Sequence, residues 1–278
     1  MNFAMFGGDE RSVRLCRLLR TDGHQVRVCA LEHSLEESLT APQAALEHAQ
    51  AVILPLPCQR GGVLTAPLSD LRLPMEELLG LIPAGTPVYA GRAEDIAPLC
   101  RALGLPLRDY FAREDLAVCN AALTAEGALA LLLQESPRAL AGSRVLICGF
   151  GRIGRLLALK LRSLGAQISV LARSAADLAW AAALGCRALD MNAPQALGCF
   201  DAVVNTIPCP LFRAPQLLAF GDALLLELAS PPYGFDPDAA RMLGKRLILA
   251  PGLPAATAPE AAAEALRDCL YGMMEEET

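Results

Sequence analysis

The feature that most constrains the fold of this 278-residue chain is a glycine motif that follows a short apolar segment. The motif is Gly149-Phe150-Gly151-Arg152-Ile153-Gly154, placed between the apolar residues 144–148 and a segment of helical period at 152–164. In a strand-turn-helix unit, the first glycine allows the tight turn, the second lets a pyrophosphate approach the backbone, and the third lets the helix pack closely on the strand. The motif therefore predicts a Rossmann-type unit that binds a dinucleotide at the helix N-terminus through Gly149 to Gly154.

The residues after the next predicted strand indicate which dinucleotide is bound. An NAD site usually places Asp or Glu about 20 residues beyond the glycine motif, where it holds the ribose 2′-hydroxyl. This chain has Ala172-Arg173-Ser174 at that place. Arg173 can pair with a 2′-phosphate and Ser174 can donate a hydrogen bond to it, whereas a carboxylate would repel it. We therefore favour NADP, with NAD possible; the alternative for Arg173 is a solvated cation at a strand end.

A third segment is expected near the nicotinamide end of the cofactor. Asn205-Thr206-Ile207-Pro208 ends the fourth strand predicted in this half of the chain. Ligands of open parallel sheets lie outside the carboxyl ends of the strands, so this loop is predicted to contact the cofactor. The loops at 228–231 and 250–254 fall at equivalent positions. For each of these residues, ordinary Pro and Gly turn chemistry is the alternative.

Strands and helices alternate along the whole chain, which predicts an α/β fold. In the first half, the apolar runs at 2–6, 25–31, 51–56 and 87–90 are typical of short parallel strands. We predict two doubly wound parallel-sheet, Rossmann-like domains with a cleft between them. The expected limits are 1–118 for an N-terminal substrate-binding domain, 119–142 for a connecting helix, 143–258 for an NADP-binding domain, and 259–278 for a C-terminal helix that packs back on the first domain.

Arginines follow three of the predicted strands in the first half. Gly7-Gly8-Asp9-Glu10-Arg11 follows the first strand, Arg60 follows the run at 51–56, and Arg92 follows the run at 87–90. The first of these segments lacks the three-glycine spacing, so a second dinucleotide is not expected. Backbone N–H groups at Gly8 together with the guanidinium groups would suit a small substrate with more than one carboxylate. Each arginine has a solvated surface role as its alternative.

Composition excludes several classes of protein. Apolar residues make up 54% of the chain, which argues against disorder and predicts a large core. The net charge of −6, without a basic stripe, argues against nucleic acid and anionic membrane surfaces as partners. No run reaches the ~18–20 uninterrupted apolar residues of a spanning helix, and the N-terminus lacks a signal-peptide pattern. The ten cysteines form no CxxC pair and histidines are scarce, so we expect a cytoplasmic protein without a metal site.

In combination, the motifs resemble those of the family formed by the A subunits of dipicolinate synthases. The segments that carry the resemblance are GGDER at 7–11, Thr124-Ala125-Glu126-Gly127, VLICGFGRIGR at 145–155, LARS at 171–174, NTIP at 205–208, LELAS at 226–230 and APGLP at 250–254. The resemblance implies oxidation of dihydrodipicolinate to dipicolinate with NAD(P)⁺, in the mother-cell cytoplasm during endospore formation. It also implies that the chain works with a flavoprotein-like B subunit, and we expect a homo-oligomer.

The reaction that the resemblance implies needs the loss of a hydride and a proton. Because the product ring is aromatic, proton loss is downhill and a strong general base is not essential. We expect Glu126 or Asp9 to accept the proton; the alternative for Glu126 is a capping or helix-surface role. The expected substrate contacts are Gly8, Asp9, Arg11, Arg60, Arg92 and Thr124.

Two other functions remain open at this point. A shikimate-dehydrogenase-like NADP oxidoreductase shares features of LARS and NTIP, but it would be expected to carry a catalytic lysine in its substrate half, and residues 1–118 contain none. The other is a non-catalytic NADP-sensing component of a two-part complex. An assay for turnover with the purified protein separates these functions.

Overall fold

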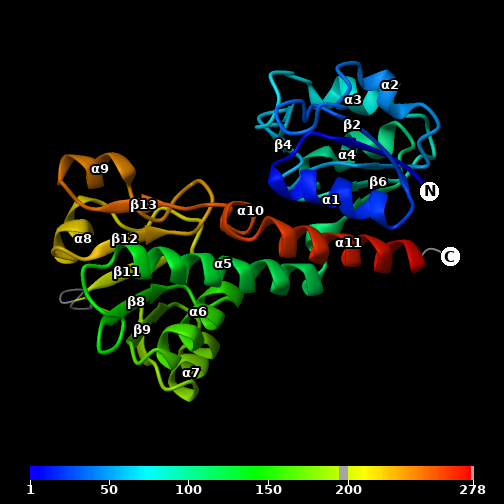
Figure 1. Cartoon of the computed structure of the whole chain (residues 1–278). Helices are drawn as coiled ribbons and strands as arrows, with labels where there is room; N and C mark the ends of the chain where they lie inside the picture. The colour runs from blue at the N-terminus through cyan, green and yellow to red at the C-terminus, as the bar shows by residue number, and fades with distance from the viewer. Residues whose placement is uncertain (194–199, 277–278) are drawn as a thin grey trace. The chain divides into compact units, whose positions relative to one another are not determined.

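The computed structural model describes residues 1–193 and 200–276 and divides the chain into two compact units (Figure 1). Unit 1 comprises Met1–Asn120 and Ala258–Thr278, and unit 2 comprises Ala121–Thr257. The boundary falls within one long helix, α5 (Glu114–Glu135). We describe each unit by itself.

Unit 1 contains a parallel five-stranded sheet. In spatial order its strands are β2 (Gln25–Cys29), β1 (Asn2–Phe6), β3 (Ala51–Ile53), β6 (Val88–Ala90) and β7 (Leu107–Asp109). This is the doubly wound order 2-1-3-4-5, in which the connections reverse direction between β1 and β3. A small antiparallel hairpin, β4 (Gln59–Arg60) with β5 (Val63–Leu64), follows β3.

Helices cover both faces of the unit 1 sheet because its strands are apolar on both sides. One face packs against α1 (Glu10–Thr21) and the C-terminal helix α11 (Pro259–Glu275), which lie side by side (Figure 1). The other face packs against α2 (Pro42–Leu46), α3 (Met75–Leu81) and α4 (Ala97–Ala102). The single-turn helices are η1 (Glu94–Ile96) and η2 (Tyr110–Ala112).

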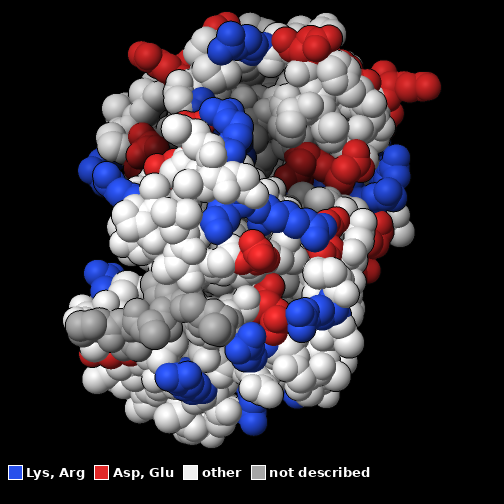
Figure 2. Space-filling view, turned by 90° about the vertical axis from the view of Figure 1, so that its left-hand side faces the viewer, with Lys and Arg blue, Asp and Glu red and all other residues white. Residues whose placement is uncertain are grey.

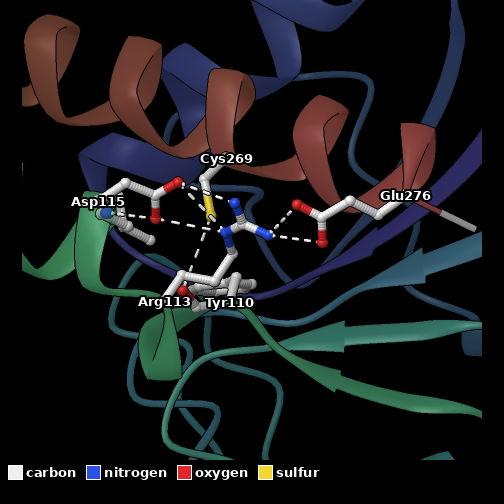
Figure 3. A network of polar contacts seen from close by, with 6 residues as sticks. Tyr110, Arg113, Asp115, Cys269 and Glu276 are labelled. Carbon is white, nitrogen blue, oxygen red and sulfur yellow. Dashed lines mark hydrogen bonds and ion pairs between the residues drawn. The ribbon is translucent and has the colours of Figure 1, made fainter.

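Polar contacts fix α11 to the segment that follows β7 (Figure 3). Arg113 donates to both carboxylate oxygens of Glu276, at 2.7 and 2.8 Å, and also pairs with Asp115. The Cys269 thiol lies 3.7 Å from the Tyr110 carbonyl oxygen. Tyr110 is fully buried and its hydroxyl donates to the Leu54 carbonyl at 2.8 Å. The C-terminal helix is thus tied to the loop after β3.

Unit 2 is built on a six-stranded parallel sheet. In spatial order its strands are β10 (Arg187–Asp190), β9 (Gln167–Ala172), β8 (Arg144–Cys148), β11 (Ala202–Asn205), β12 (Leu224–Glu227) and β13 (Leu247–Leu249). This is the Rossmann order 3-2-1-4-5-6, with the reversal between β8 and β11. With the sheet of unit 1, it confirms the predicted fold class of two doubly wound parallel sheets.

The helices of unit 2 also divide between the two faces of its sheet. The residues of α5, α6 (Arg152–Ser163) and α7 (Ala175–Ala183) share one core cluster. The opposite cluster includes α8 (Ala214–Ala219), α9 (Pro237–Met242) and three aromatic rings, of Phe212, Phe220 and Phe235. A short helix, α10 (Leu253–Thr257), follows β13.

Two differences from the sequence prediction have local causes. The helix predicted from about residue 120 begins at Glu114, because Glu114 and Asp115 place acidic side chains in its first turn, where they favour a helix N-terminus. The strand β10 was not predicted, since its residues Arg187 and Ala188 are exposed and lack an apolar pattern. Its pairing with β9, rather than its composition, makes it a strand.

One helix in the described part of the chain, α5, meets the length and composition of a membrane span. Its residues Ala125, Ala128 and Leu132 lie in the core of unit 2, as expected for a buried helix of a globular unit. Figure 2 shows basic and acidic side chains interspersed on the face that it draws, with no field of a single sign. That face therefore offers no electrostatic footprint for a polyanion.

The packing of α11 on unit 1 yields a stability prediction. Leu270 is fully buried in the core that α11 shares with α1, so Leu270→Ala should lower the free energy of unfolding by about 2–5 kcal/mol in urea titrations. Glu264→Ala, at an exposed position of the same helix, should change it by no more than about 0.5 kcal/mol. Equal stability of the two variants would show that α11 adds nothing to the core.

Candidate active site

Each of the three glycines of the motif has the conformation or the surroundings that a dinucleotide site requires at its position. Gly149 has φ +90°, a conformation that L side chains rarely adopt. A Cβ atom on Gly154 would lie 2.3 Å from the Gly149 carbonyl oxygen, so only glycine lets α6 approach β8 this closely. A Cβ on Gly151 would meet nothing within 4 Å. The space beside Gly151 is therefore open where a pyrophosphate would approach the backbone.

The N-terminus of α6 is suited to bind phosphate. Gly151 is its N-cap residue and supplies no side-chain hydrogen bond. In the described part of unit 2, the helices α7 and α9 instead begin with Ser174 and Asp236, whose side chains accept backbone hydrogen bonds. Because the first-turn N–H groups of a helix have no acceptor within the helix and the helix dipole favours an anion there, the N-terminus of α6 is a candidate phosphate site.

The residues predicted near the nicotinamide lie beside this bend. Thr206 donates from both its backbone N–H and its hydroxyl to the Cys148 carbonyl oxygen, each at 2.9 Å. Thr206 Oγ1 and Ile207 Cγ1 lie 2.5 and 2.8 Å from where a Cβ of Gly149 would stand. The loop after β11 therefore packs directly on the first glycine of the motif. This juxtaposition occurs at the reversal of strand order, where ligands of doubly wound sheets bind.

Sequence reasoning missed Glu227, a fully buried carboxylate at the end of β12. It accepts four hydrogen bonds: from Asn205 Nδ2 at 2.6 Å and from the backbone N–H groups of Ala229, Gly234 and Phe235 at 3.0, 2.8 and 3.0 Å. The sequence does contain a signal for this residue, because Glu227 interrupts the apolar run 224–228. A carboxylate in a buried strand is tolerated only where hydrogen-bond donors surround it, so its position indicates a specific polar site.

Burial raises the pKa of Glu227, although its four hydrogen bonds act in the opposite direction. The folded unit therefore binds a proton at this position more readily than the unfolded chain, in which the ordinary pKa is 4.5. The contribution of Glu227 to the free energy of unfolding consequently falls as the pH rises from that ordinary value through the raised one.

The predicted 2′-phosphate residues occupy the end of β9. Arg173 is exposed, and Ser174 is the N-cap of α7, where its hydroxyl accepts from the Asp177 N–H at 3.3 Å. Asp177 pairs with Arg155 at 2.9 Å, and the Arg155 guanidinium carbon lies 5.4 Å from the centroid of the Trp180 ring. The Asp177 carboxylate thus has Arg155 as an ion-pair partner.

In unit 1, the GGDER segment forms the turn from β1 into α1. The N–H of Gly7 donates to the Cys29 carbonyl and that of Gly8 to the Thr65 carbonyl, so neither is available for an anion. Asp9 caps α1 and accepts two hydrogen bonds from the Arg11 side chain, at 3.0 and 2.8 Å. Arg11 Nη2 also donates to the Leu56 carbonyl at 2.7 Å. Arg11 therefore holds the β3 loop against the start of α1, beside a small recess lined by Ser12, Pro55 and Tyr110.

Arg60 and Arg92 follow the two neighbouring strands. Arg60 is exposed in the hairpin after β3. Arg92 is also exposed, has the left-handed φ of +55°, and places its guanidinium 5.5 Å from the Phe111 ring centroid. Asp109 holds this backbone by accepting from the N–H groups of Arg92 and Ala93 at 3.2 and 2.8 Å. The three arginines do follow adjacent strands, because the order β1-β3-β6 is observed.

Two further predicted residues lie on α5, in the part that belongs to unit 2. Glu126 is exposed and accepts from Lys160 Nζ at 2.9 Å. Thr124 is buried, with 5% of its surface exposed. Among the described residues, no group of three or more His, Cys, Asp and Glu side chains could hold a metal ion.

Comparison with known proteins identifies first the class and then the relatives. Residues 108–211 match the NAD-binding domain of D-isomer-specific 2-hydroxyacid dehydrogenases, so unit 2 carries a nicotinamide-dinucleotide domain of the dehydrogenase type. Residues 2–111 match the N-terminal domain of the A subunit of dipicolinate synthase. A transhydrogenase from Sinorhizobium meliloti, 16% identical, shares the fold, with a TM-score of 0.66 over 98% of this chain and 92% of its own.

Whole-chain relatives give a more specific result. The dipicolinate synthase A subunit of Bacillus subtilis (strain 168) is 29% identical over 99% of this chain and 96% of its own length. The crystal structure of its Bacillus halodurans counterpart is 26% identical, with a TM-score of 0.84 over 98% of this chain and 97% of that one. The Bacillus subtilis crystal structure has a TM-score of 0.83. The resemblance to the A subunit of dipicolinate synthase that the motifs predict is therefore confirmed over the whole chain.

The two glycines with different surroundings provide a test of the dinucleotide site. Gly151→Ala places its Cβ in open space, so the melting temperature should stay near that of the wild type while the Kd for the dinucleotide rises about tenfold or more, as expected for one lost phosphate contact. Gly154→Ala should instead lower the melting temperature, because its Cβ collides with the Gly149 carbonyl. Calorimetric titration and thermal unfolding measure both effects. Wild-type affinity in Gly151→Ala would place the dinucleotide elsewhere.

Proposed function

We propose that this chain oxidises dihydrodipicolinate to dipicolinate by hydride transfer to NADP⁺. The observation that carries the proposal is the open backbone at Gly151, on an uncapped helix N-terminus at the strand-order reversal of unit 2. That geometry supports a redox dinucleotide, and the relatives named as dipicolinate synthase components support this substrate. The substrate gives up one hydride and one proton, and its ring becomes an aromatic pyridine.

The proposed cofactor contacts come from three segments of unit 2. Gly149 to Gly154 and the first turn of α6 hold the pyrophosphate, and the loop 205–208 orients the nicotinamide, which when bound accepts the hydride at C4. Arg173 and Ser174 bind the 2′-phosphate, because the end of β9 presents an exposed cation and the nearby Asp177 is already paired with Arg155. The protein's contribution is to orient the reacting groups and to exclude water.

The proposed substrate contacts favour two of the three arginines in unit 1. Arg60 and Arg92 are exposed, and a guanidinium group can bind a carboxylate in a bidentate pair. Arg11 is compensated by Asp9 and bonded to Leu56, so it positions the β3 loop rather than neutralising a substrate charge. Gly8 contributes by letting the chain turn between β1 and α1, where its φ is +109°.

The proton acceptor should be a carboxylate that can leave its ion pair in the folded protein. Asp9 is committed as a helix cap and as the partner of Arg11, and both roles need its negative charge. Glu126 keeps 57% of its side-chain surface exposed and pairs with the flexible side chain of Lys160. We therefore assign the proton to Glu126. The substrate contact predicted for Thr124, whose side chain is buried on the same helix, stays a proposal that rests on the motif alone.

The names of the relatives support a partner subunit. The lettered name of the relatives denotes one component of a complex, and we propose that this chain works together with a B subunit. From the resemblance of the motifs we propose that the chain works in the cytoplasm of a sporulating mother cell, and we also propose that it forms a homo-oligomer.

Turnover by the purified protein tests the proposed function. Dihydrodipicolinate with NADP⁺ should give the absorbance of NADPH together with that of the pyridine product. Tight NADP⁺ binding without turnover, even in the presence of the B subunit, would instead support a non-catalytic sensing role. Turnover of shikimate would support the other oxidoreductase, but none of residues 1–118 is a lysine that could serve its chemistry.

Charge reversal at the end of β9 should change cofactor preference. Arg173→Asp should raise the Kd for NADP⁺ by about a hundredfold, the size expected for a lost charge-assisted pair, and change that for NAD⁺ much less. The control Arg187→Asp makes the same charge change at the amino end of β10 and should leave both affinities unaltered. Equal effects of Arg173→Asp on the two cofactors would contradict the 2′-phosphate contact.

Removal of an exposed arginine in unit 1 should affect the substrate alone. Arg92→Ala should raise the KM for dihydrodipicolinate by about tenfold, because one carboxylate loses its partner, and leave the Kd for NADP⁺ unchanged. Arg101→Ala removes an exposed arginine from α4 and should change neither constant. Steady-state kinetics measures the difference, and an unchanged KM in Arg92→Ala would remove this residue from the substrate site.

A further inference from the structure

Glu227 is a buried charge to which the proposed hydride chemistry assigns no role. It ends β12 and pairs in register with Asn205, which ends β11. All four of its hydrogen-bond partners are N–H donors. The carboxylate form satisfies all of them, whereas a carboxyl O–H would face a donor. A charge this deeply buried is retained only where its partners are fixed around it.

Through these hydrogen bonds, Glu227 connects the segment at the end of β11 with the loop after β12. Asn205 is the last residue of β11, directly before its loop, and Ala229, Gly234 and Phe235 belong to the loop after β12. The Gly234 carbonyl in turn accepts from the N–H groups of Leu211 and Phe212, at 3.0 and 2.9 Å. A Cβ on Gly234 would lie 2.2 Å from Asn205 Nδ2, so the second loop crosses directly over the Asn205 amide.

The same amide determines the path of the nicotinamide-side loop. Asn205 Nδ2 donates to the Ile207 carbonyl at 2.9 Å, and Asn205 Oδ1 accepts from the Ile207 N–H at 3.2 Å. Its bond to Glu227 fixes which end of the amide is N and which is O, since a carboxylate can only accept. Ile207 and Thr206 then pack on Gly149. A continuous set of contacts therefore runs from Glu227 through Asn205 to the glycine bend.

We propose that Glu227 is a positioning residue, which orients the Asn205 amide and so places the loop 205–208 to receive the nicotinamide ring. The inference rests on the proposed function, because it assumes that this loop contacts the nicotinamide. In this role Glu227 acts through Asn205 and not by contact with cofactor or substrate, because both of its oxygens already accept from protein donors. Loss of Glu227 should therefore weaken the binding of the nicotinamide half of the dinucleotide and not that of the adenosine half, which binds at the opposite side of the glycine motif.

A comparison of two ligands separates positioning from simple stabilisation. The probes are NADP⁺ and 2′-phospho-ADP-ribose, which lacks the nicotinamide, titrated calorimetrically into the full chain. Glu227→Gln puts an amide NH₂ against backbone N–H groups and loses the fixed orientation of Asn205. We expect its Kd for NADP⁺ to rise about tenfold while that for 2′-phospho-ADP-ribose changes by less than about twofold. A purely structural role would weaken both ligands equally.

Two further variants keep the test decisive. Asp236→Asn alters the cap of α9, next to the same loop, and should leave the ratio of the two Kd values unchanged. Asn205→Ala removes the link while retaining the three backbone donors of Glu227, so it should show the same nicotinamide-selective loss even if Glu227→Gln fails to fold. An equal loss for both ligands, or no loss, in Asn205→Ala would overturn the proposal. Wild-type protein that binds neither ligand would instead refute the proposed function.

Discussion

The close approach of α6 to β8 is the constraint on which the rest of unit 2 depends. It exists because Gly154 has no side chain at the point where the Gly149 carbonyl stands, 2.3 Å from the position of a Cβ. That contact fixes the direction of α6, whose N-terminus has no side-chain cap and begins at Gly151, beside open space. The proposed phosphate site is thus a consequence of helix-on-strand packing and needs no dedicated side chain.

Unit 1 has the same doubly wound topology, but the turn after its first strand differs in its hydrogen bonding. Its turn after β1 has its glycine N–H groups already bonded, and Arg11 ties the β3 loop to Asp9. Those two N–H groups therefore cannot cradle a phosphate, and exposed guanidinium groups follow the next two strands. In the proposed function, one topology thus provides an anion site built from backbone in unit 2 and side chains suited to carboxylates in unit 1.

The sequence predicts the fold class and the glycine bend because both depend on local patterns. The period of apolar residues marks the strands, and the spacing of Gly149, Gly151 and Gly154 requires one geometry. Strand β10 escaped prediction because an exposed edge needs no apolar pattern. The role of Glu227 was not predicted because its four hydrogen-bond donors belong to residues 205, 229, 234 and 235, which only the folded sheet brings together. The ion pair between Asp9 and Arg11 could not be predicted either, because it depends on the conformation of the turn from β1 into α1.

A crystal structure of this protein with NADP⁺ at saturating concentration would locate the dinucleotide. We expect pyrophosphate oxygens within hydrogen-bond distance of the first-turn N–H groups of α6, with the phosphate passing over Gly151. We also expect the loop 205–208 to keep its contact with Gly149. A dinucleotide bound at any other strand end, or a glycine bend that stays without phosphate under these conditions, would refute the proposed site.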